Sequence, residues 1–257
     1  MVRLSRVLDK LKIRWKGSKE KLEKQKALNY LKNYTKRITS DGKHVEYSEL
    51  QLTWNRDILE RSIHWIPETT DKLIGIGSFQ GALEISLSHF FNKVICVDHK
   101  SFLPKWKPKN VFFHKADLDT NDWNLPEGMF DICYIIETIE HFLWSPIPLL
   151  KWAKANSHIT VISTPDDKEW PPMKIKPWTR YQHFMSIPLA FPGSTANPEP
   201  MEHCKQYSQD EFIELLTFVG FRLEEFFRTG EGHHQMVAIC SPRQDQLLIK
   251  PNQKRKD

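Results

Sequence analysis

The chain has 257 residues, of which 40% are hydrophobic and 12% are aromatic. This is enough for one full-sized packed domain with a terminal extension. No apolar run approaches the length that a membrane-spanning helix needs, so the sequence excludes a transmembrane segment and predicts a soluble protein.

The net charge of +5 is distributed unevenly along the chain. Residues 1–40 contain 13 Lys or Arg and 3 acidic residues, and residues 242–257 contain 5 and 2. Residues 41–241 are left with 19 basic and 27 acidic residues. The acidic central region argues against a broad nucleic-acid-binding face on the core, whereas the basic ends are free to bind an anionic partner.

Two helical segments are predicted ahead of the core. Residues 1–17 have apolar positions at helical spacing among basic ones, which indicates a short basic amphipathic helix. We interpret it as an arm that packs on the domain, with a membrane surface or an anionic partner such as RNA as the alternatives. Residues 19–37 predict a second, more solvated helix, and a break at residues 40–43 precedes a helix over residues 47–66.

The most informative stretch is a glycine turn between two apolar runs. Residues 73–76 predict a buried strand, residues 77–81 a tight turn and residues 82–91 a helix. A second apolar run over residues 94–97 ends at Asp98. Strand, glycine turn, helix, strand and terminal acid together predict the first half of a nucleotide-binding βαβ unit, in which Asp98 accepts hydrogen bonds from ribose hydroxyls.

This stretch resembles the first motif of class I S-adenosylmethionine-dependent methyltransferases, which runs acid-x-Gly-x-Gly-x-Gly. Gly77 and Gly81 match its first and last glycines, whereas Gly75 stands at the acidic position and Phe79 at the middle glycine. The resemblance implies that S-adenosylmethionine is the cofactor and that Asp98 binds its ribose diol. The residues that it places around the methionine and ribose are Gly75, Gly77, Ser78 and Gly81.

Further strands are predicted over residues 111–116, 129–136 and 158–163, with a helix over residues 144–155 before the last of them. In the family that the glycine motif resembles, an acid after the third strand contacts the adenine amino group and the next apolar residue packs on the ring. Asp117 and Leu118 stand at those two positions. The alternative is that Asp117 only caps a turn.

A long insertion and a capped helix follow the fifth strand. Residues 166–206 are rich in proline and show no period, and a loop of this length inside a domain is usually functional. We therefore interpret them as a segment that covers the substrate. Ser208 and Glu211 then predict a capping box at the start of a helix, and Gly220 predicts its end.

Two last apolar runs, over residues 221–227 and 235–240, predict a strand pair. The whole pattern predicts an α/β fold: a doubly wound, mostly parallel, seven-stranded Rossmann-like sheet with a C-terminal antiparallel strand pair and an N-terminal helical extension. The predicted organisation is a basic helical extension (residues 1–45), an S-adenosylmethionine-binding methyltransferase domain (46–241) and a basic, disordered tail (242–257).

The four cysteines form no C-x-x-C pair, and three of them, Cys96, Cys133 and Cys240, lie within apolar, strand-like runs. Such cysteines usually serve as small buried hydrophobic residues. We expect them to be reduced and the protein to be cytoplasmic.

Chemically reactive side chains gather after the fourth strand, in the segment Glu137-Thr-Ile-Glu140-His141. If this segment forms a helical turn, Glu137, Glu140 and His141 share a face, where they can bind a divalent ion or supply a base. Glu137 also lies at the carboxyl end of its strand, where it is placed to contact the cofactor.

The same segment resembles one found in ubiquinone-pathway O-methyltransferases and in small-RNA 3′-terminal 2′-O-methyltransferases. That resemblance implies a Mg²⁺ or Mn²⁺ site formed by Glu137, Glu140 and His141 with a later ligand, which His203 matches by its position. Two alternatives stay open: a metal-free site in which His141, assisted by Glu140, is the base or orients the substrate, and a structural role.

The leading prediction is thus an S-adenosylmethionine-dependent methyltransferase that methylates an oxygen of a small or carbohydrate-like acceptor. The first alternative is RNA 2′-O-methylation, with the basic ends bound to phosphates. The second is a non-catalytic adenosyl-binding module that serves a partner.

Overall fold

The computed structural model describes residues 24–34, 49–67, 70–118, 124–142, 145–166, 207–230 and 235–242. The amphipathic helix predicted for residues 1–17, most of the insertion, with His203, and the tail after Pro242 lie outside the described residues. No described helix is long and apolar enough to cross a membrane.

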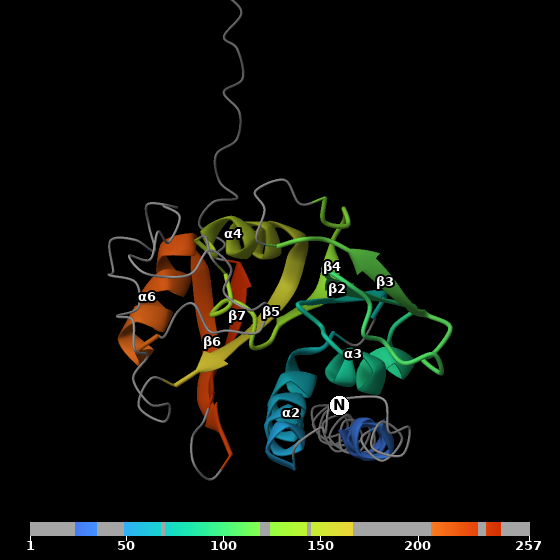
Figure 1. The fold of residues 1–257 in the computed structure, drawn as a ribbon. Coiled ribbons are helices and arrows are strands. Elements are labelled where there is room, and N and C mark those ends of the chain that lie inside the picture. The colour runs from blue at the N-terminus through green and yellow to red at the C-terminus, as the bar shows by residue number, and fades with distance from the viewer. Residues whose placement is uncertain are drawn as a thin grey trace, which may run out of the picture.

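The described strands form one seven-stranded sheet in the order β3-β2-β1-β4-β5-β7-β6 (Figure 1). Strands β1 to β5 pair in parallel, and β7 pairs antiparallel with both β5 and β6. This confirms the predicted doubly wound sheet with a C-terminal antiparallel pair. The strands are β1 (Lys72–Ile76), β2 (Lys93–Asp98), β3 (Val111–Lys115), β4 (Phe130–Ile135), β5 (Ser157–Pro165), β6 (Phe221–Thr229) and β7 (Gln235–Pro242).

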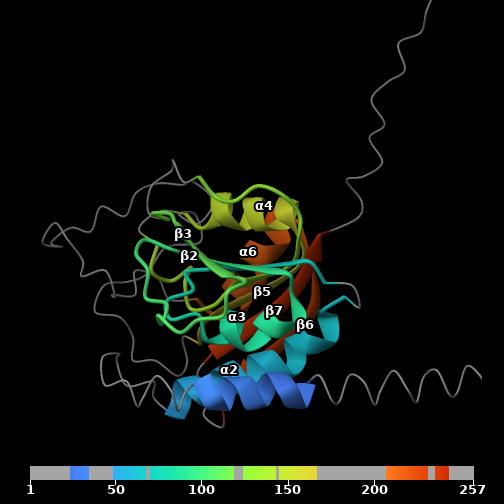
Figure 2. The ribbon, with the colours of Figure 1, turned by 90° about the vertical axis from the view of Figure 1, so that its right-hand side faces the viewer.

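Helices cover both faces of the sheet, which is why its central strands are apolar on both sides. One face is covered by α4 and α6, and the other by α2, α3 and a helix over residues 24–34 (Figures 1 and 2). Alternate strand residues supply the two cores: Ile74 packs with the first group of helices, and Leu73 with the second. The bounds are α2 (Glu49–Ser62), α3 (Ala82–Leu87), α4 (Ile147–Asn156) and α6 (Gln209–Val219), with 3-10 turns η1 (Ile63–Trp65) and η2 (Ser88–Phe90).

Residues 24–34, part of the predicted extension, are built into the domain. Ala27, Leu31 and Tyr34 are buried in the same core as α2 and α3. The Tyr34 hydroxyl donates a hydrogen bond of 2.6 Å to the backbone carbonyl of Gln80, inside the glycine turn. The helix over residues 24–34 is therefore attached to the glycine turn by this hydrogen bond.

Helix α6 has the predicted capping box. The Ser208 hydroxyl accepts from the Glu211 N–H at 3.3 Å, and the Ser208 N–H donates to the Glu211 carboxylate at 2.9 Å. Gly220 ends the helix with a φ of +92°. The predicted helix over residues 82–91 is shorter than expected, because after Leu87 the chain tightens into a 3-10 turn in which the Ser88 hydroxyl donates to the Ile85 carbonyl.

Candidate functional site

The strand order places the candidate site at the carboxyl ends of β1, β2 and β4. The chain winds outward from β1 through β2 to β3, then returns to the other side of β1 with β4 and β5. Ligands of doubly wound sheets bind beyond the carboxyl ends of the strands at such a reversal. The glycine turn follows β1, Asp98 is the last residue of β2, and the segment from Glu137 to His141 lies just beyond the end of β4.

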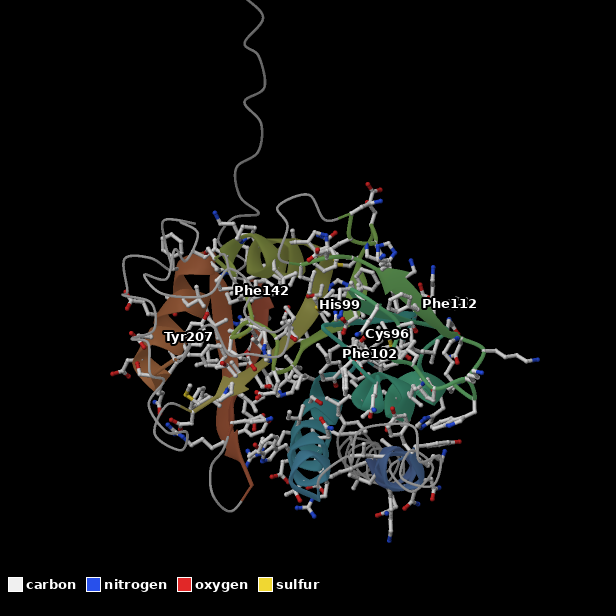
Figure 3. All side chains as sticks on the ribbon, viewed as in Figure 1. Cys96, His99, Phe102, Phe112, Phe142 and Tyr207 are labelled. Atoms are coloured by element: carbon white, nitrogen blue, oxygen red, sulfur yellow. The ribbon has the colours of Figure 1, made fainter. Side chains whose placement is uncertain are left out.

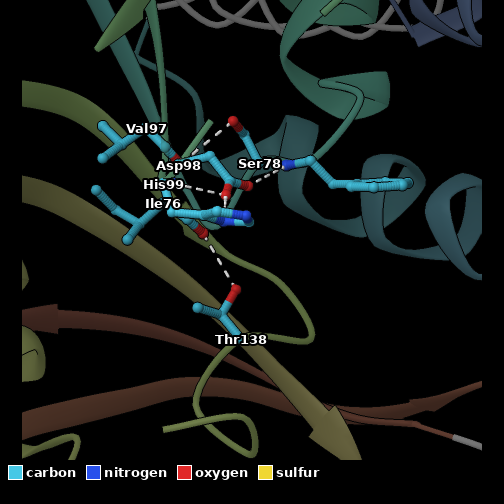
Figure 4. Close-up of polar contacts among 7 residues, drawn as sticks. Ile76, Ser78, Val97, Asp98, His99 and Thr138 are labelled. Carbon is cyan, nitrogen blue, oxygen red and sulfur yellow. Dashed lines mark hydrogen bonds and ion pairs between the residues drawn. The ribbon is translucent and has the colours of Figure 1, made fainter. Parts of the chain in front are cut away.

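Backbone hydrogen bonds tie the glycine turn to β2. The N–H groups of Gly77 and Ser78 donate to the Val97 carbonyl at 2.9 and 3.1 Å, and the Ser78 hydroxyl reaches the same carbonyl at 3.4 Å (Figure 4). Gly77 and Gly81 have φ values of +65° and +71°, which favour glycine. Phe79 has a φ of +44°, so a non-glycine residue is held in a strained conformation within the turn.

The Asp98 carboxylate, at the end of β2, accepts hydrogen bonds from the glycine turn and from the residue after the strand. One oxygen accepts the Phe79 N–H at 3.0 Å, and the other accepts the His99 N–H at 2.7 Å and lies 2.6 Å from the His99 ring Nδ1 (Figure 4). Residue Asp98 is only 9% exposed. The turn thus holds a buried acceptor at the carboxyl end of β2, and the half-exposed His99 ring stands in front of it.

Three aromatic rings lie together next to Asp98, and the sequence did not single out two of them, His99 and Phe102. The ring centroids of Phe79 and Phe102 are 4.7 Å apart, and those of His99 and Phe102 are 5.6 Å apart. Figure 3 shows His99 and Phe102 close to each other, and Tyr207 beside α6. No local pattern marks Phe102, because it lies in an irregular link whose path depends on contacts with the turn.

The two residues predicted to contact adenine lie one strand further along. Asp117 and Leu118 follow β3, and the Ala116 N–H donates to the Asp98 carbonyl at 3.0 Å. This bond brings the end of β3 next to the ribose candidate. Asp117 is exposed, whereas Leu118 is partly buried against the core. Their role toward adenine stays a prediction.

Glu137 does not begin a helical turn. Its φ is +47°, its N–H donates to the Ser163 hydroxyl at 3.1 Å, and that hydroxyl donates back to its carboxylate at 3.0 Å. Burial raises the pKa of Glu137 to about 8, although the hydrogen bonds from Ser163 and Gln235 oppose the rise. The expectation that Glu137, Glu140 and His141 share one helical face is therefore wrong, because left-handed backbone at Glu137 turns its side chain toward β5.

Glu140 and His141 remain together. Glu140 is 0% exposed, and its Oε1 lies 3.8 Å from Nε2 of His141, whose side chain keeps 30% exposure. A turn closed by the His141 N–H and the Thr138 carbonyl, 3.1 Å apart, holds the imidazole at the edge of the site. The buried tyrosine Tyr207 lies nearby, and the charge of Glu140 adds to the burial that raises its pKa. The arrangement is a partly exposed imidazole next to a buried acid.

The described residues do not fit a metal centre. Among them, no group of three or more His, Cys, Asp or Glu side chains is placed to hold an ion. Glu137 is bonded to Ser163 and lies apart from the acid–imidazole pair. The fourth predicted ligand, His203, lies outside the described part of the chain, so no chemical step is derived from a metal.

Gly77 has no room for a side chain. A Cβ added there would lie 2.6 Å from Cγ2 of buried Thr138, whose hydroxyl donates to the Ile76 carbonyl and cannot easily move. Gly128 also has a positive φ, +113°, but an added Cβ meets nothing within 4 Å. Both glycine-to-alanine changes strain the backbone, and only the first overpacks.

We therefore expect Gly77→Ala to lower the free energy of unfolding by about 3 kcal/mol, and by about 2 kcal/mol more than Gly128→Ala does. Urea denaturation of both variants measures this difference. Equal losses would contradict the steric role assigned to Thr138.

Comparison with solved structures shows proteins that share this fold. No protein-family model matches the sequence, and no curated protein matches it. Among solved structures, an S-adenosylmethionine-dependent methyltransferase from Clostridium acetobutylicum is 8% identical, covers 76% of this chain and 92% of its own length, and superimposes with a TM-score of 0.51.

A chain from the complex between the Haloferax volcanii Trm112 methyltransferase activator and a methyltransferase is 12% identical, with a TM-score of 0.52 over 75% of this chain and 92% of its own. At such identities the likeness establishes the fold. The protein therefore has the Rossmann-like fold of the S-adenosylmethionine-dependent methyltransferases.

Proposed function

We propose that the chain is an S-adenosylmethionine-dependent methyltransferase that methylates an oxygen of a small or carbohydrate-like acceptor. The observation that carries this proposal is the buried Asp98 carboxylate, held by the Phe79 N–H of the glycine turn at the carboxyl end of β2. A carboxylate so placed is suited to a ribose diol.

The residues around the turn fit the cofactor. A carboxylate has about four lone-pair sites, and two backbone N–H groups and the His99 ring Nδ1 face three of those on Asp98. Binding both ribose hydroxyls therefore requires the half-exposed His99 ring to turn away. The turn also contains a buried acceptor that is available to a ligand donor. This atom is Oε1 of Gln80, a residue 2% exposed, which meets no donor in the described structure. Gly77, Ser78 and Gly81 would hold the methionine and ribose, and Asp117 and Leu118 the adenine.

The acid–imidazole pair suits proton transfer from a hydroxyl. Bound S-adenosylmethionine supplies an electrophilic methyl group on a sulfonium. When the acceptor oxygen is methylated at the expense of the carbon–sulfur bond, the His141 imidazole would take the hydroxyl proton. The Glu140 carboxylate, 3.8 Å from Nε2, stabilises the imidazolium that results. An acceptor that carries a hydroxyl is the class that needs such a base.

The ends of the long insertion meet beside this pair. Asp166 and Tyr207, which flank residues 167–206, form a parallel bridge, and Asp166 is ion-paired with Arg228 of β6. Tyr207 lies within reach of the Glu140 charge. The insertion therefore leaves and rejoins the sheet next to the proposed base, which supports its role as a cover over the acceptor. The roles of residues 1–17 toward RNA or a membrane surface stay predictions.

Binding of the cofactor and its product tests the proposal. We expect S-adenosylmethionine and S-adenosylhomocysteine to bind the full chain, and Asp98→Ala to weaken both by about tenfold or more, since a hydrogen bond to a charged group is worth about 1.5–3 kcal/mol. Isothermal titration calorimetry measures the affinities, and circular dichroism confirms folding.

Asp71→Ala is the matched control, because Asp71 is an exposed acid just before β1, at the opposite edge of the sheet. Its affinities should equal those of the wild type. A wild-type chain that binds neither compound would refute the proposed function, and an Asp98→Ala variant with unchanged affinity would remove Asp98 from the ribose site.

A further inference from the structure

The carboxyl group of Glu84 occupies the space that a side chain on Gly75 would fill. Gly75 lies in β1 between Cys96 of β2 and Tyr134 of β4. A Cβ added to it would lie 2.6 Å from Cδ and 2.7 Å from Cγ of Glu84. Helix α3 thus sends an acidic side chain back onto the strand that precedes the glycine turn, and only a glycine at position 75 admits it.

Glu84 is an unusual residue to bury. It is 5% exposed, and among the described residues only its own backbone N–H supports its carboxyl group. Burial first, and then the charge of Asp98, raise its pKa to about 7. Its charge in turn adds to the burial that raises the pKa values of Cys96 and Cys133.

A buried acid without a cationic partner is destabilising, because desolvation is not compensated. The other residues of α3, such as Leu83, Ile85 and Leu87, are apolar or small and face the core without such a cost. A ligand cation would supply the missing partner and would also relieve the repulsion between Glu84 and Asp98. The Glu84 carboxyl group lies over Gly75, the penultimate residue of β1, beside the turn that we assign to the cofactor.

We propose that Glu84 is a further cofactor-binding residue, whose carboxylate pairs with the α-ammonium group of S-adenosylmethionine. This rests on the proposed function. With the ribose at Asp98, at the end of β2, the amino-acid part of the cofactor would reach the end of the neighbouring strand β1, where the Glu84 carboxyl lies over Gly75. Gly75 occupies the acidic position of the motif, and Glu84 returns a carboxyl group to that space from the following helix.

Binding of two nucleosides distinguishes a direct contact between Glu84 and the α-ammonium group from a general effect of Glu84 on the cofactor site. S-adenosylhomocysteine contains the α-ammonium group, whereas 5′-methylthioadenosine has the same adenosine and a thioether but no amino-acid part. We expect Glu84→Gln to weaken S-adenosylhomocysteine by about tenfold or more and to leave 5′-methylthioadenosine within about twofold of the wild type. Asp98→Ala should weaken both. Glu127→Gln is the matched control, because Glu127 is exposed before β4 at the opposite edge.

Relocating the carboxylate gives a second test. Gly75→Asp alone should lower the melting temperature, because its side chain meets Glu84. In combination with Glu84→Ala, the aspartate has room, and this double variant should bind S-adenosylhomocysteine about tenfold more tightly than Glu84→Ala alone.

The inference is overturned if Glu84→Gln affects both nucleosides equally or neither of them, or if the double variant shows no recovery, while the wild type still binds S-adenosylhomocysteine. Loss of binding by the wild type itself is a different result and counts against the proposed function. If Glu84→Gln fails to fold, the comparison of Glu84→Ala with the double variant decides the question.

Discussion

His141→Ala should lower kcat for methyl transfer to a hydroxyl acceptor by about 100- to 10,000-fold, the range that a general base contributes. The imidazole is partly exposed, and the other member of the pair, Glu140, is buried with its Oε1 3.8 Å from Nε2 of the ring. Without the imidazole, the group to which we assign the hydroxyl proton is missing. Affinity for S-adenosylhomocysteine should stay within about twofold of the wild type, because that binding needs no proton transfer.

The measurement is transfer of a labelled methyl group from S-adenosylmethionine to a panel of phenols, sugars and RNA 3′ ends, continued with the best acceptor. His158→Ala is the control, since His158 is exposed at the start of β5. A chelator should leave the wild-type rate unchanged. If a chelator abolished activity and Mn²⁺ restored it, the base role would give way to a metal site that includes residues outside the described chain.

Stability of the wild type should fall as the pH rises from 5 to 8, opposite to the trend of a salt-bridged acid. Burial raises the folded-state pKa of Glu84 to about 7 from its ordinary value of 4.5, so the folded chain holds a proton that the unfolded chain releases. That contribution is complete below pH 4.5 and is lost as the pH rises through about 7. The shift corresponds to roughly 3 kcal/mol.

Glu84→Gln should remove most of this dependence, since an amide does not titrate. Glu137, with a pKa of about 8, adds to the trend, but we expect only roughly 2 kcal/mol from it because it is partly exposed. Urea unfolding at pH 5, 6, 7 and 8 measures the slopes. The difference between Glu84→Gln and the wild type isolates the contribution of Glu84 from that of Glu137 and of every other group. Parallel curves for wild type and Glu84→Gln would show that Glu84 is already ionised in the folded chain.

Several parts of this protein follow from local sequence alone. The β1 to β2 unit was predictable because apolar runs, a glycine turn and a terminal acid each obey rules of short range. The same holds for α6, where Ser208 and Glu211 lie one helical turn apart and satisfy each other. Asp98 could be proposed because its position at the end of a strand depends only on where that strand ends.

Which side chains meet was decided by the tertiary structure. The segment from Glu137 to His141 has helical spacing in sequence, but Ser163 of β5 holds Glu137 in left-handed backbone and separates it from Glu140 and His141. Glu84 looks like the polar position of a surface helix until α3 packs on β1 and sets its carboxyl over Gly75. The positions of Glu137 and Glu84 depend on contacts between elements that come together only when the sheet assembles. The hydrophobic period and the spacing of residues along the chain do not contain this information.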